Sequence, residues 1–125
     1  MGDITVFGFE KLVAWQESKQ LVKKIYKIVE GLPGQEQYGL GNQIKRAALS
    51  VASNLAEGTG RTGFRDQAHF SQIAYGSLME VACQSVIASE LGLVSPEAYT
   101  DLRKDIETIA RLISSLRSSQ KRRVE

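Results

Sequence analysis

The stretch from Leu91 to Leu116, LGLVSPEAYTDLRKDIETIARLISSL, contains the end of one helix and the apolar side of the next. Gly92 is the residue type that most often follows the last turn of a helix. Ser95 offers a capping hydroxyl, Pro96 suits the first helical position, and Glu97 places a carboxylate at the positive end of the helix dipole. Apolar side chains then recur at spacings of three and four, at Leu102, Ile106, Ile109, Ala110, Ile113 and Leu116. This spacing predicts an amphipathic helix with one side on a core.

Three further helices precede this stretch, and breaks rich in glycine separate them. The run GLPG at 31–34 ends the first, and the run GTG at 58–60 ends the second. Thr62 is a candidate N-cap for the third, with Asp66 in its first turn. The sequence therefore predicts helices at about 9–30, 37–57, 63–91 and 96–118, followed by a flexible basic C-terminal tail.

The connections between these helices are short, so consecutive helices must run antiparallel. The predicted fold class is all-α, an up-and-down antiparallel four-helix bundle. A chain of 125 residues with 42% hydrophobic residues is large enough for one core and too small for two domains. We expect residues 1–125 to form a single domain.

Charge, hydropathy and cysteine content limit the partners and the cellular compartment that we expect for the protein. Sixteen basic and fourteen acidic residues leave a net charge of only +2, which does not by itself indicate a nucleic-acid partner. The sequence has no run of roughly 18 apolar residues, so we expect no membrane span. The single cysteine, Cys83, lies in an apolar helical pattern and has no partner for an internal disulfide. We expect a shielded, unactivated thiol and a cytoplasmic protein.

Two local patterns resemble known chemical sites but lack their context. Residues 58–63 have the spacing G-x-G-x-x-G, yet a helix rather than a strand precedes them, unlike in a dinucleotide-binding turn. His69 follows Asp66 by one turn, but it is the sole histidine, and di-metal bundles need several such ligands. We predict no catalytic residue, no cofactor site and no metal site, and hence no enzyme.

The second helix carries a polar stripe opposite its apolar face, and many of its other residues are small. A solvated face explains such a stripe, but a slim helix also permits close contact with neighbours on two sides. We interpret Asn54, Glu57 and Gly58 at the end of this helix as a structural motif, in which Glu57 accepts hydrogen bonds from Arg46 or Arg61.

Several segments resemble the four-helix-bundle proteins of the 23S rRNA intervening-sequence family in order and spacing over nearly the whole chain. They are FEKLVAWQ at 9–16, YGLGNQIKRAA at 38–48, SNLAEG at 53–58 and AYGSLME at 74–80. The resemblance implies a bacterial protein without an established biochemical activity. Relatives of that family include the accessory proteins of diversity-generating retroelements, which form pentameric barrels and bind nucleic acid.

The resemblance implies a closed homo-oligomer, with a pentamer as the specific prediction and a dimer as the more common alternative. Aromatic residues near the start of the first helix, Phe7, Phe9 and Trp15, exceed what one end of the core needs and are candidates for packing on a neighbour. Two roles stay open: binding of structured RNA or DNA through a basic rim, or a structural or protein-adaptor ring without nucleic acid.

Candidate nucleic-acid-binding residues fall into two groups, because the loop after the second helix and the C-terminus should share one end of the bundle. We predict a basic rim formed by Lys45, Arg46, Arg61, Arg65, Arg117, Lys121, Arg122 and Arg123.

Overall fold

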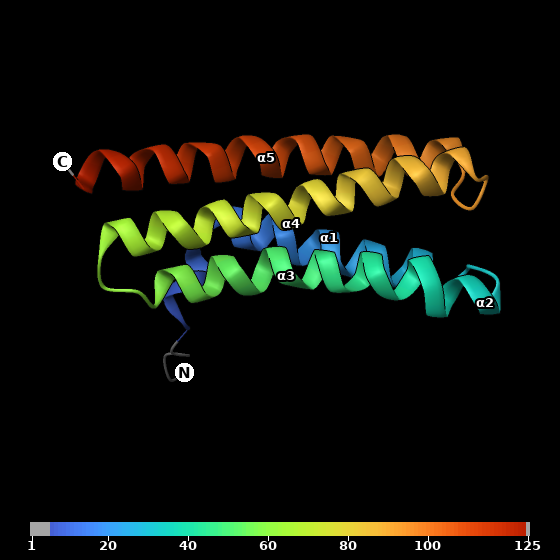
Figure 1. Ribbon diagram of the computed structural model, residues 1–125, viewed down its shortest axis with the longest axis horizontal. Helices are drawn as coiled ribbons and strands as arrows, with labels where there is room; N and C mark the ends of the chain where they lie inside the picture. The colour runs from blue at the N-terminus through green and yellow to red at the C-terminus, as the bar shows by residue number, and fades with distance from the viewer. Residues whose placement is uncertain (1–5, 125) are drawn as a thin grey trace, which may run out of the picture.

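The computed structural model describes residues 6–124, and all of the regular structure in that range is helical (Figure 1). Four long helices make up the molecule, with bounds α1 Val13–Glu30, α3 Asn42–Thr59, α4 Phe64–Glu90 and α5 Pro96–Val124. Short turns flank them, namely a 3₁₀ turn over Gly8–Lys11, a single helical turn α2 over Gly34–Glu36 and a π-helical turn over Gln37–Gly41.

The four long helices lie side by side in antiparallel order, so the predicted up-and-down bundle is confirmed (Figure 1). Helix α1 packs on α3 and α5, and α4 packs on the same two helices. The loop between α3 and α4 and both chain ends lie at one end of the bundle. The loop between α4 and α5 and the turn α2 lie at the other.

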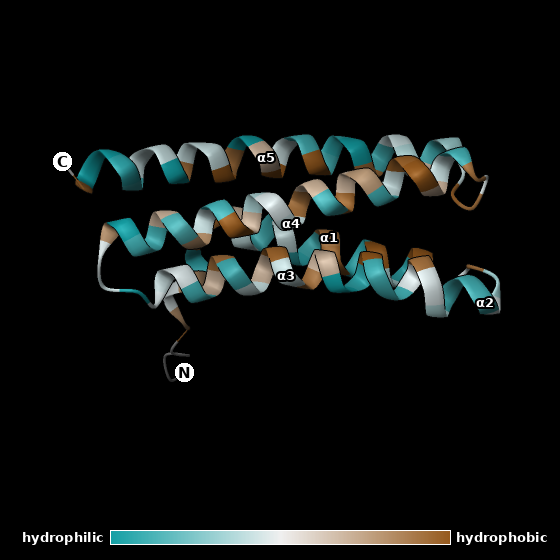
Figure 2. Ribbon diagram, in the orientation of Figure 1, coloured by the Kyte–Doolittle hydropathy of each residue, from teal (hydrophilic) through white to brown (hydrophobic). Residues whose placement is uncertain are grey.

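The core is a continuous layer of aliphatic side chains between the four helices, and the hydropathy of the ribbons alternates accordingly around each helix (Figure 2). Its largest side chains with less than 2% exposure are Leu21, Ile25, Val51, Leu78, Val81, Leu102, Ile109 and Ile113. Alanines such as Ala48 of α3 and Ala74 of α4, both 0% exposed, belong to the same core, and these two helices pack on each other. Small residues at these positions let the two helix backbones approach closely.

The connection between α4 and α5 has the conformation that its sequence indicates. Gly92 adopts a φ of +73°, its N–H bonds to Ser89 O at 3.0 Å, and the Leu93 N–H bonds to Ala88 O at 2.9 Å. These two bonds form a Schellman motif, which suits glycine because the left-handed conformation strains other residues. Across the turn, the Ala98 N–H donates to Ser95 Oγ at 3.1 Å, so the Ser95 cap is confirmed.

The beginnings of the first two predicted helices differ from the sequence prediction. The chain over 9–12 forms a 3₁₀ turn and a break before α1 starts at Val13. Residues 37–41 form a wider π turn before α3 begins. Here Gly41 is buried, and a Cβ on it would lie only 2.8 Å from Val29 Cγ1 of α1. Close contact with α1 therefore requires a glycine at this turn.

Two further boundaries correct the sequence prediction. Thr62 is not the N-cap of α4, because Gly63 holds that position and makes no side-chain cap. The basic C-terminal segment, predicted to be a flexible tail after about residue 118, is helical through Val124. It lies along the first turns of α4, where the Ser71 hydroxyl donates to Gln120 Oε1 at 2.7 Å. Helix–helix contacts thus extend α5 beyond the point where its apolar periodicity ends.

Two other expectations concern the exposure of Cys83 and the presence of a membrane-spanning helix. Cys83 is exposed, contrary to the predicted shielded thiol, because it lies on the outer side of α4. No helix between residues 6 and 124 is both long enough and apolar enough to cross a membrane.

Helices α1 and α5 are joined at the surface by Lys24, whose Nζ lies 2.8 Å from Asp101 Oδ2 and 2.6 Å from Asp105 Oδ2. Hydrogen bonds to Asp101 and then Asp105 raise the pKa of Lys24 above its ordinary value of 10.5. A raised folded-state pKa stabilises the fold below the ordinary value, and this contribution is lost as the pH rises through the folded-state pKa.

We expect Lys24→Met to lower the free energy of unfolding by about 0.5–1 kcal/mol at neutral pH, because the pair is largely solvent-screened. The difference from wild type should shrink when the pH is raised from 9 to 12. Urea denaturation across that range measures it, with Lys23→Met as the exposed control. A difference that stays constant with pH would contradict this role of the ion pairs.

Candidate nucleic-acid interface

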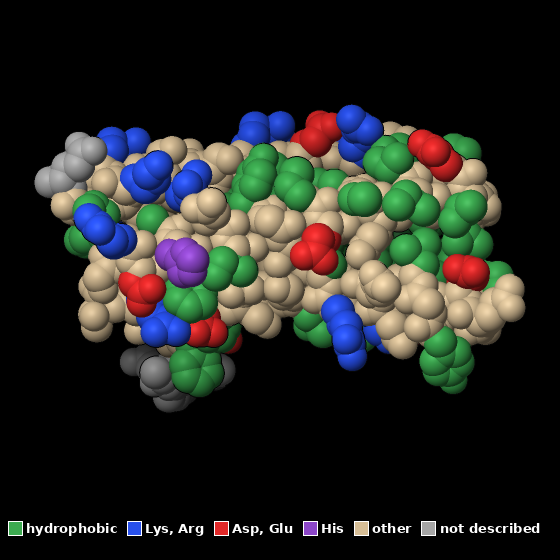
Figure 3. Space-filling view, viewed as in Figure 1, with side chains coloured by type: hydrophobic (Ala, Val, Ile, Leu, Met, Phe, Trp, Pro, Cys, Tyr) green, Lys and Arg blue, Asp and Glu red, His purple; other side chains and the backbone are tan. Residues whose placement is uncertain are grey.

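A groove between the start of α4 and the end of α5 collects basic side chains from both helices. We call it the basic groove, and its polar lining consists of Arg65, His69 and Gln72 from α4 with Arg117 and Lys121 from α5. Its volume is about 470 Å³, and Ala68 and Val124 complete the lining. Figure 3 shows several Lys and Arg side chains near the histidine at this end of the molecule, with acidic side chains on the side away from the C-terminus. None of the side chains lining the groove is acidic.

Local packing positions the basic groove. Arg117 Nη2 donates to Gln72 Oε1 at 3.0 Å, which joins the two walls. The Nε of Arg117 is buried and has no hydrogen-bond partner in the described chain. A buried, unpaired donor of a charged group is costly, so Arg117 is held in the groove wall with one of its five N–H donors unsatisfied.

Arg61 lies near this end of the bundle but is engaged locally. Its guanidinium lies 2.5 Å from Glu57 Oε2 and 3.7 Å from Asp66 Oδ2. It also stacks over the Phe70 ring, 4.5 Å from the centroid. Because two carboxylates already balance its charge, Arg61 contributes less to the local potential than the cations of the basic groove.

The last residues of α5 point in different directions. The Arg123 guanidinium covers the Phe64 ring at 5.3 Å from its centroid. Arg122 lies with Arg111 along a shallow serine-lined depression of α5, separate from the basic groove. The cations at the C-terminus therefore surround the end of α5 rather than form one flat patch.

Lys45 and Arg46 do not join the other predicted residues. They lie in the first turns of α3, and the axial rise of a helix places Arg46 about 20 Å from Thr59 at the other end. Lys45 Nζ covers the Tyr26 ring at 4.8 Å, and Arg46 lines a groove that also contains Glu80. The predicted grouping of these two residues with the loop after α3 was wrong, because most of the helix separates them from it.

The predicted structural motif lies at the end of α3. Asn54 Nδ2 donates to Ser50 O at 2.8 Å and to Ser50 Oγ at 3.0 Å, and Ser50 Oγ hydrogen-bonds Ser77 Oγ of α4 at 2.8 Å. Gly58 is buried, and a Cβ on it would lie 3.1 Å from the Cβ of Phe70. Gly58 thus lies against α4, and Asn54 supports the contact of Ser50 with that helix.

Glu57 pairs with Arg61, not Arg46, and its side chain is 52% exposed. The predicted partner Arg61 is confirmed, and the interaction is a surface ion pair between residues four apart on the chain. Such pairs contribute little to stability, since water and salt screen them.

We expect Glu57→Gln to lower the free energy of unfolding by no more than about 0.5 kcal/mol. Urea denaturation in low and high salt measures the effect, which salt should reduce. Glu107→Gln, which breaks another exposed pair with Arg103, is the matched control. A loss of several kcal/mol specific to Glu57→Gln would show that this carboxylate has a structural role beyond the ion pair.

His69 and Gln72 belong to the groove but were not predicted to bind. The signal was available in the sequence, because Arg65, His69 and Gln72 follow one another at spacings of four and three, and Arg117 and Lys121 are four apart. The His69 ring packs edge-to-face on Phe70, with centroids 5.8 Å apart. Between residues 6 and 124, no three His, Cys, Asp or Glu side chains form a group that could hold a metal ion.

Comparisons with known proteins identify similarities over most of the chain. The family model described as "23S rRNA-intervening sequence protein" matches residues 10–115. A comparison with curated proteins gave no match. The fold is similar to a crystal structure of a protein of unknown function from the S23 ribosomal protein family of Bacteroides thetaiotaomicron VPI-5482. The TM-score is 0.76 at 20% identity, over 83% of this chain and 97% of that chain.

Proposed function

We propose that this chain, which belongs to the family of 23S rRNA-intervening sequence proteins, is a non-enzymatic homo-oligomer that binds nucleic acid through its basic groove. Structured RNA or DNA is the partner class. Of the residues that the sequence predicted for binding, Arg65, Arg117 and Lys121 are the principal phosphate contacts in this proposal.

The observation that carries the proposal is the convergence of these three cations, from two helices, on one groove without an acidic lining residue. The net charge of +2 supplies almost no general attraction, so binding must come from local clustering of this kind. Two guanidinium groups and one ammonium group favour an anionic acceptor at this place. Phosphate oxygens meet this requirement, because they accept charge-assisted hydrogen bonds from guanidinium groups.

We propose binding without catalysis because of the residue types that line the groove. Histidine is the side-chain type that most often serves as a general base near neutral pH, but the lining offers His69 neither a carboxylate to orient it nor a nucleophile beside it. Guanidinium and ammonium groups bind phosphate without themselves exchanging protons at this pH. Binding is thus the activity that these residue types support.

The homo-oligomer in the proposal rests on a partly exposed aromatic cluster beside α1, in which Phe7 is exposed while Phe9 and Trp15 are half-buried. Phe7 is 70% exposed and stacks on Phe9, with ring centroids 5.6 Å apart, and Phe9 packs edge-to-face on Trp15 at 4.8 Å. A large exposed aromatic group is a common feature of protein interfaces. We propose a ring of five copies, the number that the related retroelement accessory proteins suggest.

We expect light scattering to give a closed oligomer for wild type and a smaller species for Phe7→Ser, because this change removes the exposed ring. Tyr38→Ser is the control, since Tyr38 is 81% exposed at the opposite end of the bundle. A wild-type monomer at micromolar concentration would contradict the oligomer.

A titration of labelled RNA and DNA at several salt concentrations tests nucleic-acid binding. The affinity should fall with increasing salt, with a slope set by the number of phosphates neutralised. An oligomer that shows no salt-sensitive binding would instead support the second role, a structural or protein-adaptor ring.

A further inference from the structure

A second groove lies between α4 and α5, away from the basic groove. It has a volume of about 290 Å³ and a mostly apolar lining that includes Met79, Ala82, Val86 and Ile106. This volume lies at the small end of the range for ligand pockets, roughly 300–1,000 Å³. Methionine in such a wall adapts its shape to different ligands. The groove therefore has room for one ring or a short chain.

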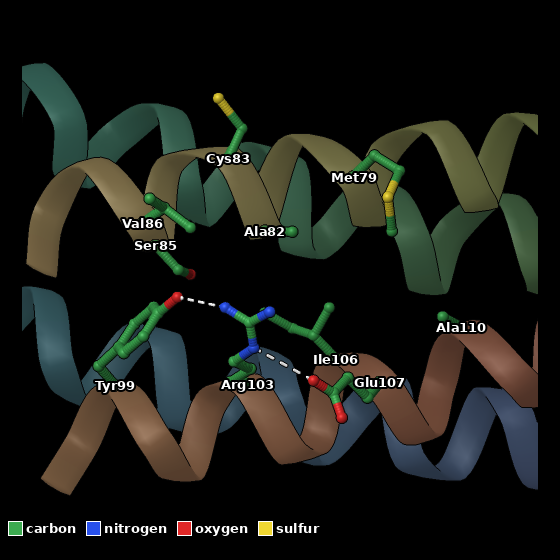
Figure 4. Close-up of a pocket in the computed structure, with 10 residues that line it drawn as sticks. All are labelled: Met79, Ala82, Cys83, Ser85, Val86, Tyr99, Arg103, Ile106, Glu107 and Ala110. Atoms are coloured by element: carbon green, nitrogen blue, oxygen red, sulfur yellow. Dashed lines mark hydrogen bonds and ion pairs between the residues drawn. The ribbon is translucent and has the colours of Figure 1, made fainter. Parts of the chain in front are cut away.

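The floor of this groove contains a polar group that lacks a partner. Ser85 is 2% exposed, and its Oγ makes no hydrogen bond within the described chain. Figure 4 shows this oxygen pointing from α4 toward Tyr99 and Arg103 of α5. An unpaired buried hydroxyl costs free energy, which a ligand that bonds to it would restore.

The charged groups at the rim are already paired with each other. Arg103 donates from Nη1 to the Tyr99 hydroxyl at 2.9 Å and from Nε to Glu107 Oε1 at 3.1 Å (Figure 4). The rim thus carries no net charge. The Tyr99 oxygen accepts from Arg103, so its own proton remains free to donate to a ligand. A ligand with one hydroxyl or carbonyl group would find two partners, Ser85 and Tyr99.

We propose that the groove between α4 and α5 binds a small uncharged molecule, with an apolar ring or short chain and one hydroxyl or carbonyl group that bonds to Ser85. The paired Arg103 and Glu107 disfavour a charged ligand, because either sign would compete with an existing partner. This proposal is independent of nucleic-acid binding, which uses other residues at the end of the bundle.

Three related probes test the proposal by calorimetry with the full chain. We expect 4-ethylphenol to bind, and ethylbenzene, which lacks the hydroxyl, to bind about three- to tenfold more weakly. The charged 4-ethylbenzoate should also bind more weakly than the phenol. Tighter binding of ethylbenzoate would overturn the uncharged ligand class, and equal binding of ethylbenzene would overturn the role of the buried hydroxyl.

Single substitutions test whether the probes bind in this groove. Ser85→Ala should abolish the preference for 4-ethylphenol over ethylbenzene without destabilising the fold, because the lost hydroxyl has no partner. Ser18→Ala is the matched control, since Ser18 is equally buried but donates to Ala14 O at 2.7 Å. Ala82→Leu should fill the groove and prevent binding of all three probes.

Two results would overturn the site itself. One is a preference for the phenol that survives Ser85→Ala. The other is a wild-type protein that binds no probe while Ala82→Leu changes its mass in light scattering, which would show that a second copy of the chain covers this groove.

Discussion

Reversal of the charges at Arg65, Arg117 and Lys121 to glutamate is expected to weaken nucleic-acid binding by roughly a hundredfold or more, because three charge-assisted phosphate contacts are lost. The slope of log affinity against log salt should fall by about two for a single-stranded ligand, since each phosphate contact contributes about 0.7. Fluorescence anisotropy with labelled RNA at several salt concentrations measures both quantities.

The matched control reverses the charges of Lys45, Arg46 and Lys104, which lie in the first turns of α3 and α5. Both triple variants lower the net charge by the same amount, so they separate a specific groove from general attraction. Circular dichroism of each variant checks the fold, because Arg117 also bonds to Gln72. Equal weakening by the control variant, or unchanged binding by the groove variant, would remove the basic groove as the site.

Leu78→Ala is expected to lower the free energy of unfolding by about 3 kcal/mol, since it removes a fully buried side chain and leaves a cavity. For a domain of this size the melting temperature should fall by roughly 10 °C. Urea denaturation measures the change. Leu49→Ala on the neighbouring helix is the control, because Leu49 is 42% exposed and its loss should cost less than about 1 kcal/mol.

Similar effects of the two leucine substitutions would contradict the observed packing, in which Leu78 belongs to the core and Leu49 to the surface.

The parts of the fold that follow from local chemistry could be predicted from the sequence. The Schellman turn at Gly92 and the cap at Ser95 depend on residue types within a few positions, so both were identified. The four helices and their antiparallel order follow from apolar spacing and short connections. The close contact of Gly41 with Val29 of α1, where a Cβ would have only 2.8 Å of room, could not be predicted, because it depends on packing between two helices.

In the candidate site, too, features set by local sequence could be predicted, and features set by contacts between helices could not. Arg117 and Lys121 were identified as basic residues of one segment, but their alignment with Arg65 depends on α5 continuing as a helix along α4. Arg46 was grouped with the loop after α3, although most of the length of α3 separates this residue from that loop. The pairing of Arg61 with Glu57 was one of two predicted alternatives, whereas its second partner, Asp66, was not predicted although it lies only five residues away.

The most direct test of nucleic-acid binding at the basic groove is an NMR titration of the isotope-labelled protein with a short RNA. We predict that the largest shift changes occur at His69, Gln72, Arg117 and Lys121, and that they reverse when salt is added. Changes centred on Lys45 and Arg46, or no salt-sensitive changes at all, would contradict the proposed function.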